Sequence, residues 1–155
     1  MERARPARWS DAGRLVALCR DALSEIRSER GGGQLAGDLL AGRSVDDLVD
    51  EALGSPDAHV VAGEYDGVVL AVGVVRGVAG AAARIEALYV HPGARAVGVG
   101  EAVLDALSAW AAARGCTGLD AVALPGDRPA KAFFEAHGMV ARALVMHRPI
   151  PPVAQ

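Results

Sequence analysis

The sequence predicts a mixed α/β fold in which a mostly antiparallel sheet carries helices on both faces. Residues 59–90 hold three apolar runs separated by turn residues, which is typical of an antiparallel meander. Segments with apolar residues at helical spacing lie before and after this meander. The chain has 155 residues, of which 52% are hydrophobic. We therefore expect a single domain over residues 1–150 and a short tail over 151–155.

The first half of the chain is predicted to be mainly helical. A short strand over 3–8 precedes a helix over 11–28, which we expect to end at the glycine run 31–33. A second helix is expected over 35–53. The acidic second half of that helix is typical of a face turned to solvent.

Strands and helices alternate after the meander. Helical spacing predicts helices over 100–114 and 127–137. The apolar runs between and after them predict strands over 119–124 and 139–148. The prolines that begin at Pro149 end regular structure, because proline cannot donate a backbone hydrogen bond.

The composition excludes several classes of partner and site. A formal charge of −3 with 4% aromatic residues argues against a nucleic-acid binder, which needs a basic surface. The charged N-terminus has no apolar core of a signal peptide, and we expect neither a membrane partner nor a membrane span. Cys19 and Cys116 lie far apart without a second cysteine nearby, so neither a metal site nor a disulfide is expected. Free thiols indicate a cytoplasmic location.

The stretch VHPGARAVGVGEAV, residues 90–103, joins a predicted strand to a predicted helix. It lacks the lysine of a nucleotide-triphosphate loop and the third glycine of a dinucleotide fingerprint. The first-turn N–H groups of a helix nevertheless attract anions, and Gly98 and Gly100 leave the backbone accessible. Arg95 adds a positive charge that can pair with phosphate. The alternative is a flexible loop with a chance arginine.

The same stretch resembles a known family. Arg95-x-x-Gly98-x-Gly100 is similar to the R/Q-x-x-G-x-G/A pyrophosphate loop of the GNAT N-acetyltransferases. The segments IEALYVHP, DRPAKAFFEAHGM and RPARWSDAGRLVALCRDA look like other elements of that family, in the same order along the chain. The resemblance covers nearly the whole chain.

The resemblance implies that acetyl-CoA is the acyl donor. Backbone amides of residues 96–101 would hold the pyrophosphate, and strand 84–90, bulged near its end, would bind the pantetheine arm. Strands 84–90 and 119–124 would splay apart in the middle of the sheet to admit the thioester. The residues implied for donor binding are Leu88, Tyr89, Val90, Arg95, Ala96, Val97, Gly98, Val99, Gly100, Glu101, Asp127 and Phe134.

The chemistry of amine acetylation needs a base and is helped by an acid. Glu86 matches a position that some family members use as the base; its alternative is a strand carboxylate paired with Arg84 or another cation. The family often has a tyrosine acid where this chain has Phe134, which carries no hydroxyl. Tyr89 or Tyr65 could protonate the thiolate instead, or the thiolate leaves unassisted.

The leading hypothesis is therefore an N-acetyltransferase that moves acetyl from acetyl-CoA directly to a primary amine of a small molecule or a protein. A module that binds acetyl-CoA without turnover is the alternative, and a different nucleotide-binding protein is disfavoured. The acceptor is expected beside residues 27–37, where acidic residues attract a cationic amine. Homodimers are common in the family.

Overall fold

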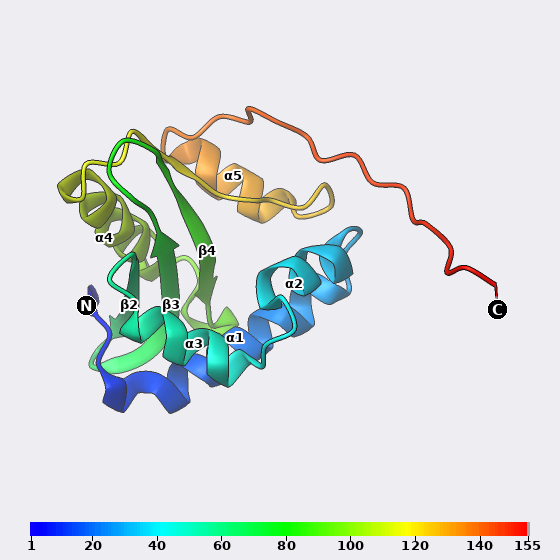
Figure 1. The fold of residues 1–155 in the computed structure, drawn as a ribbon. Coiled ribbons are helices and arrows are strands. Elements are labelled where there is room, and N and C mark those ends of the chain that lie inside the picture. Colours follow the sequence, from blue (N-terminus) through cyan, green and yellow to red (C-terminus); the bar gives the residue numbers. More distant parts are fainter. Residues whose placement is uncertain (155) are drawn as a thin grey trace.

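The computed structural model describes residues 1–154 and has a five-stranded sheet in the order β1-β2-β3-β4-β5. Figure 1 shows the arrangement of its helices and strands. The elements in chain order are β1 (Glu2–Pro6), a 3-10 turn (Trp9–Asp11), α1 (Ala12–Arg27), α2 (Gly32–Leu40), α3 (Val45–Gly54), β2 (Ala58–Tyr65), β3 (Val68–Arg76), β4 (Ala82–Val90), a 3-10 turn (Pro92–Ala94), α4 (Val99–Ala113), β5 (Gly118–Asp120) and α5 (Arg128–Ala136).

The sheet is the mixed, mostly antiparallel one that the sequence predicts. Strands β1 to β4 pair in antiparallel fashion, and β4 pairs with β5 in parallel. The parallel pairing is short, because it joins only residues 82–84 to residues 118–120. The predicted strand 119–124 thus ends at Asp120, and the two strands diverge beyond that point.

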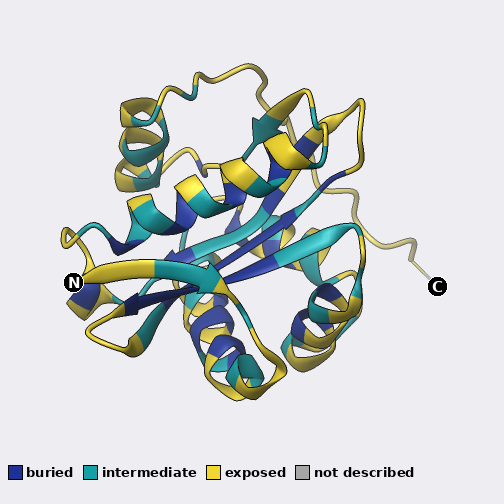
Figure 2. Ribbon diagram, turned by 90° about the vertical axis from the view of Figure 1, so that its left-hand side faces the viewer, coloured by how far each residue is buried: buried dark blue, intermediate teal, exposed yellow. Residues whose placement is uncertain are grey.

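Helices cover both faces of the sheet, and each face has its own apolar core. Helices α1 and α3 pack on one face, around Leu15, Leu18 and Val49. Helix α4 packs on the other face, around Val103 and Leu107. In Figure 2 the buried side of these helices turns toward the sheet.

Glycines in the sheet let α4 approach it closely. A Cβ atom at Gly73 would lie 2.5 Å from Val103 Cγ1, and one at Gly63 would lie 2.7 Å from Val103 Cγ2. These distances are shorter than real carbon contacts, so neither position tolerates a side chain without a shift of α4. Gly73, which interrupts a β-branched run, is therefore explained by helix packing.

The predicted helix 35–53 is wrong as one element, because the chain forms two helices there. Helix α2 ends at Ala41 and Gly42, which adopt left-handed φ values of 50° and 82°. Arg43 Nε and Nη2 then donate to the carbonyl oxygens of Leu40 and Leu39 at 2.9 and 3.0 Å. These bonds satisfy carbonyl groups that the helix end leaves free, and Ser44 begins α3.

The glycine run 31–33 starts a helix as well as ending one. Gly31 adopts φ 81° and α2 begins at Gly32. A Cβ atom at Gly32 would lie 1.5 Å from the Ile26 carbonyl oxygen. Only glycine fits there, so α2 folds back directly against the end of α1.

The predicted last strand over 139–148 is wrong for this chain. Helix α5 is followed by Gly138 at φ 83°, and residues 140–154 form neither helix nor strand. In Figure 1 this tail runs away from the body of the protein. Val140, Leu144, Val145 and Met146 are each more than 80% exposed. The apolar pattern indicates a segment able to pair on both sides, but it does not specify a neighbouring strand, and within residues 1–154 this segment pairs with none.

Within residues 1–154, no helix combines the length and apolar character needed to cross a membrane.

Candidate functional site

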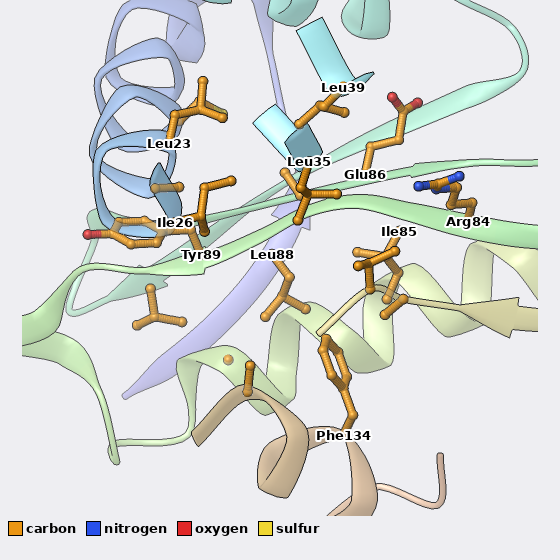
Figure 3. Close-up of a pocket in the computed structure, with 18 of the residues that line it drawn as sticks. Leu23, Ile26, Leu35, Leu39, Arg84, Ile85, Glu86, Leu88, Tyr89 and Phe134 are labelled. Carbon is orange, nitrogen blue, oxygen red and sulfur yellow. The ribbon is translucent and has the colours of Figure 1, made fainter. Parts of the chain in front are cut away.

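A cavity of about 1380 Å³ opens where β4 and β5 diverge. Helices α1 and α2 form one wall, β4 lies along its floor, and the 95–101 loop and α5 close the other side. Figure 3 shows side chains of these elements pointing toward the space between them. The short β4–β5 pairing creates this opening.

Residues 85–90 of β4 present a free backbone edge to the cavity. The N–H of His91 donates to Leu70 O at 2.8 Å, toward β3. Because successive residues of a strand direct their peptide groups to alternate sides, those of Val90 and Leu88 face away from β3. The Val90 carbonyl accepts a bond from Arg95 Nε at 3.0 Å. This edge offers donors and acceptors to an extended ligand.

A bulge interrupts β4 at Glu86. Ala87 pairs with Val74 and Ile85 with Val75, so Glu86 has no partner residue on β3. The extra residue turns the strand locally and re-aims the side chain. A bulge is therefore present, but it lies in the middle of β4 rather than near its end, at the residue that the resemblance suggests as the base.

The loop between β4 and α4 presents a row of unpaired N–H groups. Ala96 and Gly98 have φ values of 69° and 87°, and α4 begins at Val99. Across residues 1–154, no backbone carbonyl or side chain accepts a hydrogen bond from the N–H groups of residues 96–101. Together with the positive end of the α4 dipole, these donors form a site suited to a phosphate group.

The two loop glycines serve different purposes. Gly98 holds a left-handed conformation that glycine adopts without strain. At Gly100 a Cβ atom would lie 3.3 Å from Val90 Cγ2 and 3.6 Å from Phe133 Cε2. Gly100 therefore also allows α4 to pack closely between β4 and α5, a requirement that the sequence motif does not reveal.

Arg95 is held away from the loop amides by α1. Its Nη2 lies 3.2 and 3.1 Å from the two carboxylate oxygens of Glu25, and its guanidinium carbon lies 5.5 Å from the centre of the Tyr89 ring. The Tyr89 hydroxyl donates to Glu25 Oε1 at 2.9 Å. Burial and the nearby Glu25 carboxylate raise the pKa of Tyr89 to about 12, so Tyr89 keeps its proton at neutral pH.

Glu86 forms an ion pair with Arg76 of β3. Arg76 Nε lies 2.5 Å from Glu86 Oε1, and Arg76 Nη2 lies 2.7 Å from Glu51 Oε2. The Glu86 side chain is only 14% exposed. In residues 1–154, Glu86 Oε2 has no hydrogen-bond partner. The cation beside Glu86 is thus Arg76 rather than Arg84, and one carboxylate oxygen stays available.

Helix α5 carries the remaining predicted residues. Asp127 caps its N-terminus by accepting a bond from Ala130 N at 3.1 Å. Figure 3 shows the Phe134 ring directed from α5 toward the cavity. Phe133 packs beside it with ring centres 5.5 Å apart. Phe134 therefore supplies an apolar surface at the place where the cavity meets the divergent strands.

A comparison with protein families matches residues 28–139 to the Acetyltransferase (GNAT) family. The chain belongs to the GNAT family. It is accordingly an acyl-CoA-dependent N-acetyltransferase, and acetyl-CoA is its acyl donor. No curated protein matches the sequence.

Solved structures share the GNAT fold at low identity. The aminoglycoside acetyltransferase AAC(6')-Iy, in complex with a bisubstrate analogue, has a TM-score of 0.71 and 15% identity over 97% of this chain and 99% of its own. A predicted acetyltransferase with acetyl-CoA from Clostridium acetobutylicum has a TM-score of 0.69 and 16% identity over 96% of each chain. A ribosomal-protein-alanine N-acetyltransferase from Brucella melitensis has a TM-score of 0.66 and 16% identity over 97% of this chain and 100% of its own.

Most residues predicted for this GNAT site line one cavity. The exceptions are Val97, whose side chain is 39% exposed, and Val99, which is fully buried; both contribute only backbone to the loop. The predicted residues that line the cavity are Glu86, Leu88, Tyr89, Val90, Arg95, Ala96, Gly98, Gly100, Glu101, Asp127 and Phe134. The alternative acid Tyr65 is not among the lining residues and ends β2.

The donor fits the residues that are present. The unpaired amides of 96–101 match the anionic pyrophosphate, and the free edge of β4 matches an extended amide-containing arm. Sequence reasoning missed Arg76 and the role of Glu25, because each contacts its partner across a long separation in the chain. The single available indication was that a carboxylate inside an apolar strand needs a cationic partner.

Proposed function

We propose that this enzyme transfers acetyl from acetyl-CoA directly to a primary amine of a small molecule or a protein. The observation that carries the proposal is the convergence of three features on one cavity. These are the unpaired N–H groups of residues 96–101, the free edge of β4, and Glu86 at the β4 bulge. They supply phosphate binding, an extended docking edge and a carboxylate base.

Donor binding follows from the chain's own groups. The amides of residues 96–101 and the start of α4 would hold the pyrophosphate. Peptide groups of Leu88 and Val90 would bind the pantetheine arm as an added strand. Arg95 must leave the Val90 carbonyl for that carbonyl to accept from the arm.

Glu86 is placed to remove the proton of the attacking ammonium. Its Oε1 is occupied by Arg76, so Oε2 would accept the proton, either directly or through a water molecule. Arg76 fixes the position of the carboxylate and offsets its charge when no substrate is bound. The N–H groups freed by the β4 bulge would stabilise the oxyanion of the attacked thioester carbonyl.

Direct transfer is favoured over an acetylated enzyme. Cys19 lines the cavity, but burial raises the pKa of its thiol to about 11 and only 5% of the residue is exposed. A thiol in that state is a poor nucleophile. Cys116 lies elsewhere, beside the Val78 carbonyl.

The departing thiolate receives no side-chain proton from Phe134. Tyr89 is the nearby hydroxyl, but its raised pKa and its bond to Glu25 make it a weak acid here. We therefore propose that the thiolate leaves without a protein acid and takes its proton from solvent.

The test measures CoA release and N-acetyl product together, with acetyl-CoA and a panel of primary amines. Glu86→Gln should lower kcat by about a hundredfold, the lower range for loss of a general base. Asp105→Asn, an exposed acid on α4 outside the cavity, is the matched control and should leave kcat unchanged. Donor binding without amine-dependent CoA release would favour a sensor over an enzyme.

We also propose that the enzyme works in the cytoplasm as a homodimer. Two free cysteines suit a reducing compartment.

The exposed apolar residues of the 140–154 tail favour burial against a second copy. The double variant Leu144→Ser with Met146→Ser should sediment as a monomer where the unaltered chain sediments as a dimer. An unaltered chain that is monomeric at high concentration contradicts the dimer.

A further inference from the structure

Helices α1 and α2 give the cavity an apolar wall opposite β4. Ile26 comes from the end of α1, and Leu35 and Leu39 come from successive turns of α2. All three are half-buried and line the cavity. In Figure 3 they point toward Leu88 and Tyr89 of β4.

This wall adjoins the core around α1 and α3, against which Leu39 also packs. Leu23, one turn before Ile26, is 6% exposed and extends the same lining toward the interior. The spacing of Leu35 and Leu39 places both side chains on one face of α2, which covers β4 without closing on it. Because Gly32 locks α2 against the Ile26 carbonyl, the wall is fixed in position.

Most arginines around this half of the cavity are already paired with acids. Arg76 binds Glu86 and Glu51, and Arg95 binds Glu25. Arg43 also pairs, with Glu51. These pairs leave little net charge for a ligand.

The unpaired charges that line the cavity are few. Within residues 1–154, Glu29, Asp38, Asp127 and Arg84 form no ion pair. Glu29 Oε2 lies 3.1 Å from the Cβ position of Gly126, so its carboxylate reaches the opposite side of the opening. Three acids against one arginine attract a cationic ligand, and the apolar wall favours one whose body is apolar.

The geometry points to a monoamine acceptor whose single ammonium is carried on an apolar alkyl or arylalkyl body. The body would pack on Ile26, Leu35 and Leu39 while the nitrogen reaches Glu86. The inference rests on the proposed acetyl transfer. The amine nitrogen forms a bond to the acetyl carbon, the carbon–sulfur bond breaks, the ammonium loses two protons in all, and one of these balances the thiol of released CoA.

The test is kcat/KM for ethylamine, butylamine, hexylamine and phenethylamine, against spermidine and an aminoglycoside, at saturating acetyl-CoA. Each added methylene buried on the wall should raise kcat/KM up to about fourfold. Hexylamine, with four more methylenes, should therefore exceed ethylamine by up to about 250-fold, and the polycations should be poor acceptors. A flat series, or polycations as the best acceptors, would overturn the inference.

A wall variant separates packing from chemistry. Leu35→Asn should lower kcat/KM for hexylamine by about tenfold, leave that for ethylamine within about twofold, and leave the Kd for acetyl-CoA unchanged. Val68→Ser, at an exposed position of β3 outside the cavity, is the control and should change none of these values. An equal loss for both amines would show that Leu35 acts through folding and would overturn the wall's role.

Binding distinguishes this inference from the proposed function. Calorimetry gives the Kd of hexylamine and of ethylamine for the CoA-bound protein. These values measure the contribution of the wall to amine binding in the absence of turnover. Tighter binding of hexylamine with no acetylation of any amine would overturn the transfer function and support the apolar site. Rapid acetylation of spermidine, with no gain from chain length, would support the transfer function and overturn the apolar site.

Discussion

The Arg95–Glu25 ion pair gives opposite predictions for its two members. Both side chains are about half exposed, at 49% and 47%, so their pair is worth about 0.2–1 kcal/mol. If Arg95 leaves Glu25 to bind the pyrophosphate, this pair competes with the donor. Removing the competitor should strengthen donor binding, whereas removing Arg95 should weaken it.

The magnitudes follow from the contacts. Glu25→Gln removes the ion pair that competes with the donor for Arg95. The amide oxygen of the glutamine can still accept from the Tyr89 hydroxyl. At about 1.4 kcal/mol per tenfold, the Kd for CoA should fall by a factor of about 1.4–5. Arg95→Ala loses the charge-assisted bond to the pyrophosphate, which is worth about 1.5–3 kcal/mol. The energy of the Arg95–Glu25 pair, which must break for this bond to form, is subtracted from that value. The Kd of this variant should rise by a factor of about 2–100.

The assay is isothermal titration with CoA at low and high salt, since CoA binds without turning over. The Glu25→Gln gain should shrink at high salt, because salt screens the exposed pair. If both variants weaken CoA binding equally, the pair stabilises the apo site and Arg95 does not bind the donor.

Three further changes test separate parts of the account. Phe134→Tyr restores a hydroxyl facing the cavity and should raise kcat if thiolate departure limits turnover; an unchanged kcat in stopped-flow CoA release would show that it does not. Gly98→Ala forces φ 87° on a residue with a Cβ, which costs about 1–2 kcal/mol. This variant should raise the Kd for CoA at least fivefold, whereas the control Gly13→Ala on α1 should leave that Kd unchanged. Arg5 lowers the pKa of Asp11 from 3.8 to about 2, so the stability from this pair is present above pH 4 and lost as pH falls toward 2. Arg5→Gln should reduce that acid-dependent loss in thermal unfolding.

The fold was predictable wherever a local pattern coincides with the final packing. The hairpin at Asp66-Gly67, the meander and α4 all follow from side-chain periodicity and turn residues. The split of the second helix was missed, although Gly42 and the N-cap Ser44 are local signals of a helix end and a helix start. The strand expected over 139–148 failed because periodicity reports what a segment can bury and says nothing about an available neighbour.

The site likewise contains residues that the sequence identifies and residues that it does not. The loop residues could be identified because their motif depends on local backbone conformation. Arg76 and Glu25 could not, because their distances to Glu86 and Arg95 arise only when β3 and α1 fold against β4. The apolar wall also depends on tertiary contact, since Leu35 and Leu39 are ordinary helix positions until Gly32 sets the direction of α2.

The most direct test of the account is the stoichiometry of CoA and N-acetylamine formed from acetyl-CoA and hexylamine, measured together by thiol titration and mass spectrometry. We predict that amine-dependent release yields one N-acetylhexylamine per CoA and leaves no acetyl group on the protein. CoA release that does not depend on the amine, or an acetylated enzyme that precedes product, would contradict direct transfer at this site.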